Sequence, residues 1–213
     1  TEAVQILIQE SKIRDAMRKA KEYQRKKNWE KAFQYSIEAV DLNENYIPSQ
    51  LLLADIQTQR GYYQAALDTT SYLKKEYPAN SDVAYSYISS LMKVEKMDVA
   101  NQQISFISNE TKFFLLPKFQ ALLGEYWLKK NNFSFAIQYF QMAIKKDPLN
   151  DTYYYIMARE FFKKKRFKDA KEFLSKCLDL DPDNVFYLSL QGAILYELED
   201  DDTDIGYLRD VLK

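Results

Sequence analysis

Residues 167–170 read Phe167-Lys168-Asp169-Ala170, and the same order, a large apolar residue followed three positions later by alanine, recurs along the chain. The alanines are spaced 34, 34, 36 and 34 residues apart, at Ala32, Ala66, Ala100, Ala136 and Ala170. The large residues before them are Trp29, Tyr63, Met97, Phe133 and Phe167. A period of this length is typical of stacked copies of one small unit that cannot bury its apolar face alone. The chain is therefore predicted to be a repeat protein that offers an extended binding surface.

Other positions of the repeat predict that each unit is a pair of helices. Twelve residues before each alanine the residue is mostly small, namely Ala20, Ala54, Ile88, Gly124 and Ala158. Small residues on facing sides let two helix axes approach to about 8–10 Å. Prolines that end the second helix follow twelve residues after three of the alanines, at Pro78, Pro148 and Pro182. Short polar residues that can cap the next helix come two residues after these prolines, at Asn80, Asn150 and Asn184. The chain is therefore expected to be all-α.

This pattern resembles the tetratricopeptide repeat family, from about Ile13 to the end of the chain. The resemblance is close at residues 23–39, 124–148 and 158–182, which include Trp29-Glu30-Lys31-Ala32-Phe33 and Phe167-Lys168-Asp169-Ala170. It implies a right-handed α-solenoid of stacked antiparallel helix pairs, forming one domain over residues 1–213. The implied repeats are 13–46, 47–80, 81–116, 117–150, 151–184 and 185–213, with residues 1–12 as a helical extension.

Two repeats depart from the family pattern. The third has Ile88 at the small position, lacks the closing proline, and is followed by two extra residues near 109–117. The sixth keeps Gly192, Leu195, Leu208 and Val211 but has Asp204 where the alanine belongs. Because the last unit of a solenoid has no successor to pack against, the sixth repeat is interpreted as a solvent-facing cap or a truncated unit.

Several residue types that enzymes use are absent from the sequence. There is no histidine, no glycine-rich phosphate loop, and only one cysteine, Cys177. These absences remove histidine-based acid–base catalysis, catalytic triads and nearly every zinc or iron site. We therefore expect no enzyme activity, no cofactor and no metal. Cys177 occupies a position that is small or aliphatic in other repeats, and we expect it in the core.

The first helices of the repeats are expected to line a concave groove. Residues spaced to point into this groove include apolar and charged side chains, which are Met17, Lys21, Leu51, Asp55, Tyr85, Met92, Glu125, Leu128, Tyr155, Arg159 and Phe162. An apolar and aromatic strip edged by charge favours an adaptor that holds an extended or helical segment of a partner protein. The alternative is that tight coiling, or another segment, covers these side chains. Family members that clamp chaperone carboxylates need a basic and asparagine set, of which only Lys21 is present, so a non-clamp type is expected.

Charge is unevenly distributed although the net charge is −1. Residues 12–31 contain nine basic and three acidic residues, whereas residues 181–213 contain nine acidic residues against Arg209 and Lys213. These ends could be solvated caps. They could also join copies or sister subunits, which makes an assembly subunit the alternative function. The basic run 163–166 stands at a turn with no wider basic stripe, so nucleic-acid binding is not expected.

The sequence contains no apolar stretch of the roughly 20 residues that a membrane span needs, and no signal sequence opens it. No direct membrane span is expected, and the cytoplasm is the default location. The start at Thr1 rather than methionine indicates a fragment of a longer chain, from which a signal, an anchor or further domains could be missing.

Overall fold

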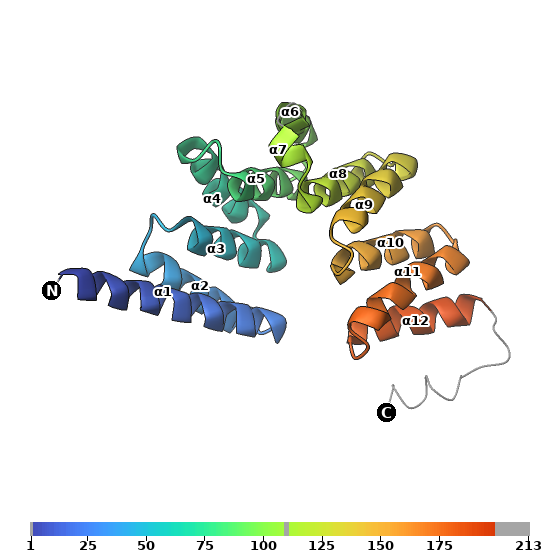
Figure 1. Ribbon diagram of the computed structural model, residues 1–213, viewed down its shortest axis with the longest axis horizontal. Coiled ribbons are helices and arrows are strands. Elements are labelled where there is room, and N and C mark those ends of the chain that lie inside the picture. Colours follow the sequence, from blue (N-terminus) through green and yellow to red (C-terminus); the bar gives the residue numbers. More distant parts are fainter. Residues whose placement is uncertain (1, 109–110, 199–213) are drawn as a thin grey trace. The chain divides into compact units, whose positions relative to one another are not determined.

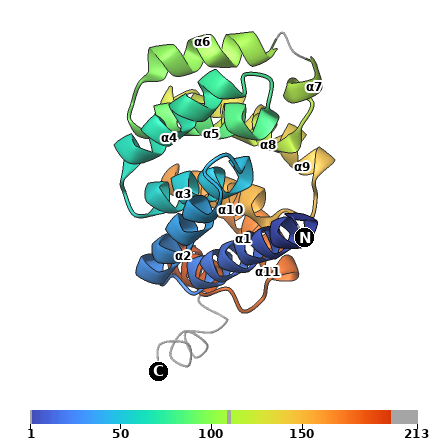
Figure 2. The same ribbon diagram turned by 90° about the vertical axis from the view of Figure 1, so that its left-hand side faces the viewer.

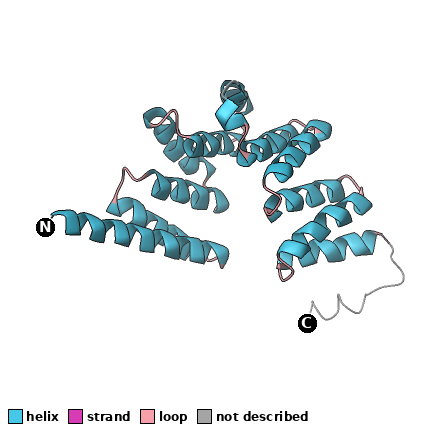
Figure 3. Cartoon of the chain, in the orientation of Figure 1, coloured by secondary structure: helices cyan, strands magenta, loops and turns pink. Residues whose placement is uncertain are grey.

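A computed structural model describes residues 2–108 and 111–198, and within these residues every regular element is a helix (Figure 3). The chain forms two compact units, residues 1–114 and 115–213, which are described one at a time. The helices of unit 1 are α1 (Glu2–Arg25), α2 (Trp29–Leu42), α3 (Ile47–Gln59), α4 (Tyr63–Glu76), α5 (Ser81–Lys93), α6 (Met97–Ser108) and α7 (Thr111–Phe114). Those of unit 2 are α8 (Pro117–Lys129), α9 (Phe133–Lys146), α10 (Asp151–Lys163), α11 (Phe167–Leu180) and α12 (Val185–Glu197) (Figure 1).

Consecutive helices pack as antiparallel pairs in both units. In unit 1, α1 lies alongside α2, α3 packs on α4 and α5 packs on α6 (Figure 2). The first helix of one pair also contacts the first helix of the next pair, as α1 does α3 and α3 does α5. In unit 2 the pairs are α8 with α9 and α10 with α11, and α12 packs on both α11 and α10. The predicted all-α helical repeat architecture is thereby confirmed.

The recurring alanines lie where the helices of a pair touch. All five have an exposed fraction of 0%, at Ala32, Ala66, Ala100, Ala136 and Ala170. At Gly124 of α8, which is the small residue on the first helix of its pair, the two helices also lie close together. A Cβ atom added there would lie 2.6 Å from Cε2 of Phe140 on α9, well inside normal contact. Close approach of the helices therefore explains why small residues recur at these positions.

Each complete pair reverses direction through a turn of the same backbone geometry. One residue in every such turn has positive φ, and these residues are Lys27, Gly61, Glu95, Asn131 and Lys165. Their spacing of 34, 34, 36 and 34 residues repeats that of the alanines. In two pairs an asparagine next to the positive-φ residue caps the second helix, because the side chains of Asn28 and Asn132 accept hydrogen bonds from the amides of Lys31 and Phe135.

The second helices end just before the predicted prolines, because proline disfavours helical geometry in the residue before it. The helix α4 ends at Glu76, α9 at Lys146 and α11 at Leu180, two residues ahead of the proline in each case. The side chain of Asn80 then accepts hydrogen bonds from the amides of Asp82 at 2.9 Å and Val83 at 3.1 Å, which caps α5. Thus a proline stop and an asparagine start separate α4 from α5.

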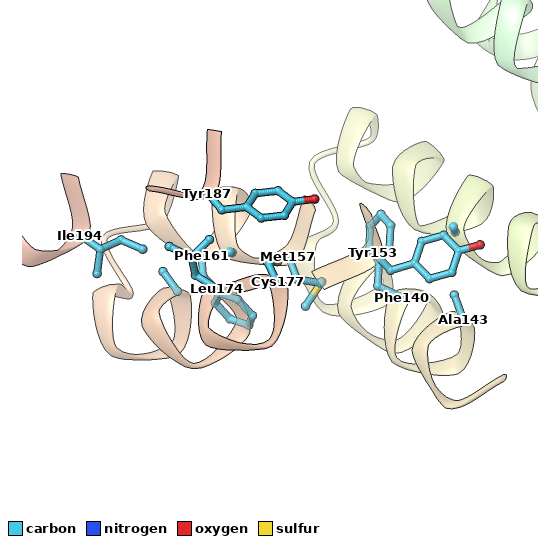
Figure 4. Packing of buried hydrophobic residues seen from close by; sticks show 12 residues of the cluster. Phe140, Ala143, Tyr153, Met157, Phe161, Leu174, Cys177, Tyr187 and Ile194 are labelled. Atoms are coloured by element: carbon cyan, nitrogen blue, oxygen red, sulfur yellow. The ribbon is translucent and has the colours of Figure 1, made fainter. Parts of the chain in front are cut away.

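Each unit has its own core. In unit 1, α1, α2 and α3 share a cluster of Ala20, Ala32, Leu52 and Ile56. In unit 2 a larger cluster runs from α8 to α12, and Figure 4 shows its central side chains. Cys177 lies in this cluster with an exposed fraction of 0%, as predicted. Burial raises the pKa of its thiol to about 12.

The irregular third and sixth repeats differ in how much of them is described. The short helix α7 forms within the insertion predicted near residues 109–117, and residues 109 and 110 lie outside the described residues. Of the sixth repeat only α12 is described, because Asp204, Leu208 and Val211 lie outside the described residues, as does the acidic run from Glu199 to Asp204. The repeat limits and the single domain over residues 1–213 stay predictions.

Candidate protein-interaction surface

The predicted groove residues lie on the first helix of each pair. Unit 1 carries six of them, Met17 and Lys21 on α1, Leu51 and Asp55 on α3, and Tyr85 and Met92 on α5. Unit 2 carries the other five, Glu125 and Leu128 on α8, and Tyr155, Arg159 and Phe162 on α10. We call the solvent-accessible faces of α1, α3, α5, α8, α10 and α12 the first-helix surface of the unit to which they belong.

In unit 1 the charged members are exposed and most apolar members are half-buried. Lys21 and Asp55 are exposed, and the Asp55 carboxylate accepts a hydrogen bond of 2.6 Å from the Gln24 side-chain amide, which links α3 to α1. Leu51 and Tyr85 are half-buried, and Met17 packs against the Ala20 cluster while remaining partly accessible. These side chains can contact a bound molecule without leaving their places in the fold.

Met92 does not belong to this surface, and the prediction that it is exposed is wrong. Its exposed fraction is 2%, and its neighbours Ile88 and Leu91 are buried to the same degree. The reason is that α5 is packed on three sides, by α3, α4 and α6, so a wide arc of its circumference belongs to the core. Helical spacing alone cannot distinguish core-facing positions of such a helix from groove-facing ones.

One stretch of α1 forms a shallow trough of about 290 Å³. Its lining residues are mostly basic, and they are Arg14, Met17, Arg18, Lys21 and Arg25 of α1 and Tyr46 at the start of α3. We call this the α1 trough. It contains two predicted groove residues, Met17 and Lys21, and adds three arginines that the sequence marked only as part of a basic region.

In unit 2 the aromatic members of the surface also take part in internal packing. The ring of Tyr155 lies 5.0 Å from that of Tyr187 on α12, measured between centroids, and the guanidinium of the exposed Arg159 lies 5.8 Å from the Tyr155 ring. Phe162 lies 5.5 Å from Phe167. Tyr155, Phe162 and Leu128 are half-buried against the core of unit 2, and Glu125 is half-buried. Truncating either aromatic ring would therefore disturb the core as well as the surface.

Two exposed aromatic residues extend the surface onto α12. Tyr196 has an exposed fraction of 81% and Phe186 one of 47%. With Ser189 and Ala193 they fall at i, i+3, i+7 and i+10, so the four residues share one face of the helix. Small side chains thus separate two aromatic ones. Phe186 stands in the first turn of α12 and Tyr196 in its last turn.

A hydrogen bond that the sequence did not indicate ties α12 to α10. The Tyr187 hydroxyl donates to the Asp151 carboxylate at 2.7 Å. Burial, together with this hydrogen bond, raises the pKa of Tyr187 well above its usual range. The Cys177 thiol also lies 3.7 Å from the carbonyl oxygen of Asp151. Asp151 therefore connects three helices at the base of the α10 and α12 faces.

The end of unit 2 carries an apolar cavity of about 270 Å³ between α11 and α12. Its apolar lining consists of Leu174, Leu178, Ile194 and Leu195, and Lys171 and Asp179 lie among its polar residues. This cavity is separate from the α10 face.

Within the residues that the structure describes, no group of three or more histidine, cysteine or acidic side chains could hold a metal ion. None of the described helices combines the length and the apolar character needed to cross a membrane.

Helix pairs that stack through first helices, close on buried alanines and reverse through equivalent turns define an α-helical repeat protein. Comparison with known families identifies the repeat. Residues 151–184, which span α10 and α11, match the model of the tetratricopeptide repeat. Residues 151–184 therefore form a tetratricopeptide repeat, and the fold of the chain is that of tetratricopeptide repeat proteins, as the resemblance implied. No match was found among functionally characterised protein sequences.

Solved structures with this fold resemble the chain over most of its length. A thermophilic tetratricopeptide repeat protein from Thermus thermophilus has a TM-score of 0.74 at 14% identity, over 87% of this chain and 98% of that one. PilW, a type IV pilus biogenesis factor, has a TM-score of 0.66 at 16% identity, over 90% and 86%. PilF of Pseudomonas aeruginosa has a TM-score of 0.61 at 17% identity, over 93% and 90%. At these identities the likeness shows the fold alone.

Proposed function

We propose that the chain is an adaptor that holds an extended or helical segment of a partner protein on its first-helix surface. The observation that carries this proposal is the face of α12, where Tyr196 is 81% exposed and Phe186 is 47% exposed. Large aromatic side chains in water are costly unless something covers them, and they are frequent anchors of protein interfaces. The exposed Arg159 on the adjoining helix α10 supplies a positive charge to the same first-helix surface.

Selection from a random-peptide library tests this proposal. Peptides selected on the wild-type chain are expected to bind a Tyr196→Ser, Arg159→Glu variant or an α1-trough variant much more weakly, depending on the unit that they occupy. The control is Tyr72→Ser with Lys168→Glu, which makes the same chemical changes at exposed positions of the second helices α4 and α11. Selected peptides that bind all first-helix variants as tightly as the wild type would contradict the proposal.

A second candidate function is that of an assembly subunit joined to copies or sister subunits through its ends. The apolar cavity between α11 and α12 favours this reading, as do the exposed apolar residues Val4, Leu7 and Ile8 near the start of α1. Light scattering over a range of concentrations and salt decides the matter. Apolar end contacts should survive salt, whereas contacts between the basic and acidic ends should weaken. A chain that stays monomeric at all concentrations would exclude self-assembly.

A further inference from the structure

The α1 trough concentrates positive charge on one face of a helix. Arg14, Arg18, Lys21 and Arg25 follow one another at intervals of four, three and four residues, so their side chains share that face. Within the described residues neither Lys21 nor Arg25 has a salt bridge within 4 Å. Met17 and Tyr46 add apolar surface to the trough. The trough is therefore lined by both basic and apolar side chains.

The acidic residues of α1 neutralise this face only in part, because they pair with Arg14 and Arg18 but not with Lys21 or Arg25, and lysines outside the trough also engage them. The Asp15 carboxylate forms salt bridges with Lys19 at 2.8 Å and with Arg18 at 2.6 Å. Hydrogen bonds from Lys19 and then Arg18 lower the pKa of Asp15.

Glu22 is engaged in the same way by Lys26 at 2.7 Å, and that hydrogen bond lowers the pKa of Glu22. The remaining acidic neighbour is Glu10, whose carboxylate lies 3.5 Å from Arg14 at the amino-terminal end of the trough. Such exposed pairs within one helix contribute little to stability and exchange readily for other partners.

The spacing of the four cations fits an extended chain. At a helical rise of about 1.5 Å per residue, Arg14 and Arg25 are about 16 Å apart along the axis, which equals about five residues of extended peptide. Successive cations are separated by about 6, 4.5 and 6 Å. Side chains on one side of an extended peptide repeat about every 6.6 Å, which is close to the two longer intervals.

We propose that the α1 trough binds an extended acidic segment of a partner protein, with carboxylates at alternate positions and an apolar residue over Met17. This inference rests on the proposed function and names the chemistry of the segment that unit 1 accepts. Asp55 of α3, held by Gln24, borders the first-helix surface on the side of α3 and repels acidic side chains there. The segment consequently runs along α1 rather than across to α3.

Fluorescence polarisation with labelled ten-residue peptides tests the proposal on the full chain. The probe has aspartate or glutamate at alternate positions with leucine and alanine between them. A matched peptide replaces every acid by its amide, and a third has the same composition with the acids grouped at one end. The alternating acidic peptide is expected to bind best and to lose affinity as salt rises, and the amide peptide is expected not to bind.

The protein variants localise the effect. Lys21→Glu with Arg25→Glu is expected to weaken binding of the alternating peptide roughly tenfold or more, since attraction becomes repulsion at two sites. Lys12→Glu with Lys96→Glu changes the net charge equally, at exposed residues of unit 1 outside the trough, and should leave the affinity nearly unchanged. Circular dichroism of both variants confirms folding.

Four results would overturn the proposal. The first is equal loss in both double variants, and the second is equal binding of the amide or grouped peptide. The third is tighter binding of a single-stranded DNA oligonucleotide of the same charge. The fourth is self-association of the chain in which residues 199–204 of a second copy bind in the trough. If library-selected peptides bind the first-helix surface but are indifferent to Lys21→Glu with Arg25→Glu, this inference fails while the proposed function stands.

Discussion

Replacement of Gly124 by alanine tests how tightly the helix pairs close. The new Cβ would lie 2.6 and 2.7 Å from two carbons of the Phe140 ring, about 1 Å closer than ordinary carbon contacts allow. Phe140 has an exposed fraction of 0%, so its ring cannot swing into solvent. Overpacking of this kind costs about 1–3 kcal/mol, and the better helix propensity of alanine returns about 1 kcal/mol. Because the clash is severe, we expect Gly124→Ala to destabilise unit 2 by about 1–2 kcal/mol.

The same substitution in a Phe140→Ala protein is a sharper test, because there Gly124→Ala should no longer destabilise unit 2. Phe140→Ala alone should cost about 3–5 kcal/mol through the cavity that it leaves. With the ring gone, Gly124→Ala should be neutral or stabilising by up to about 1 kcal/mol, since only the propensity gain remains. The two substitutions are thus expected to couple strongly in a double-mutant cycle.

Urea unfolding followed by tryptophan fluorescence measures these free energies in unit 2 alone. The chain has two tryptophans, one in each unit, so Trp29→Phe leaves Trp127 as the reporter. Trp127 lies on α8 with Gly124, and its ring is 4.9 Å from that of Phe135 on α9. A Gly124→Ala variant that is as stable as its parent, or that loses the same free energy with and without the Phe140 ring, would refute the close approach of α8 and α9.

Three further predictions concern the turns, the Tyr187 hydrogen bond and the cysteine. Gly61→Ala should lower the free energy of unfolding by about 1 kcal/mol, because φ is +82° at this turn. Glu95→Gly, at an equivalent turn, should raise the free energy of unfolding by up to about 1 kcal/mol. Equal effects of the two substitutions in thermal unfolding would contradict this. Tyr187→Phe removes the hydrogen bond to Oδ2 of Asp151 and should lower the free energy of unfolding by about 1–3 kcal/mol. Since folding raises the pKa of Tyr187, the wild type should lose stability as the pH rises above about 10, and denaturant titrations should show a smaller loss in the variant. Cys177 is buried with a raised pKa, so a thiol reagent should label it only on unfolding, and fast labelling of the native chain would argue against its place in the core.

The core positions could be predicted from the sequence because one local rule repeats. Each alanine must meet a neighbouring helix, and that need returns at a nearly fixed interval whatever the surroundings. Periodicity therefore identified the five buried alanines and the core position of Cys177. It also marked the insertion after the third repeat, where α7 forms, although it could not indicate a helix there.

The candidate surface was harder to predict because exposure depends on how many neighbours a helix has. Met92 occupies a groove-facing position in the pattern, yet α5 is packed by three helices and buries it. Tyr155 lies on the predicted surface, but its ring also packs against the ring of Tyr187. This contact joins residues that are 32 positions apart in the sequence. The basic character of α1 was visible in the sequence, whereas the α1 trough follows from side-chain geometry.

Methyl NMR of the methionines gives the most direct test of partner binding on the first-helix surface. The chain has five methionines, and Met17 lies in the α1 trough while Met142 is exposed on the second helix α9. The alternating acidic peptide is expected to shift the Met17 methyl signal in a saturable manner and to leave Met142 unchanged. A saturable shift at Met142 with none at Met17 would contradict binding on the first helices.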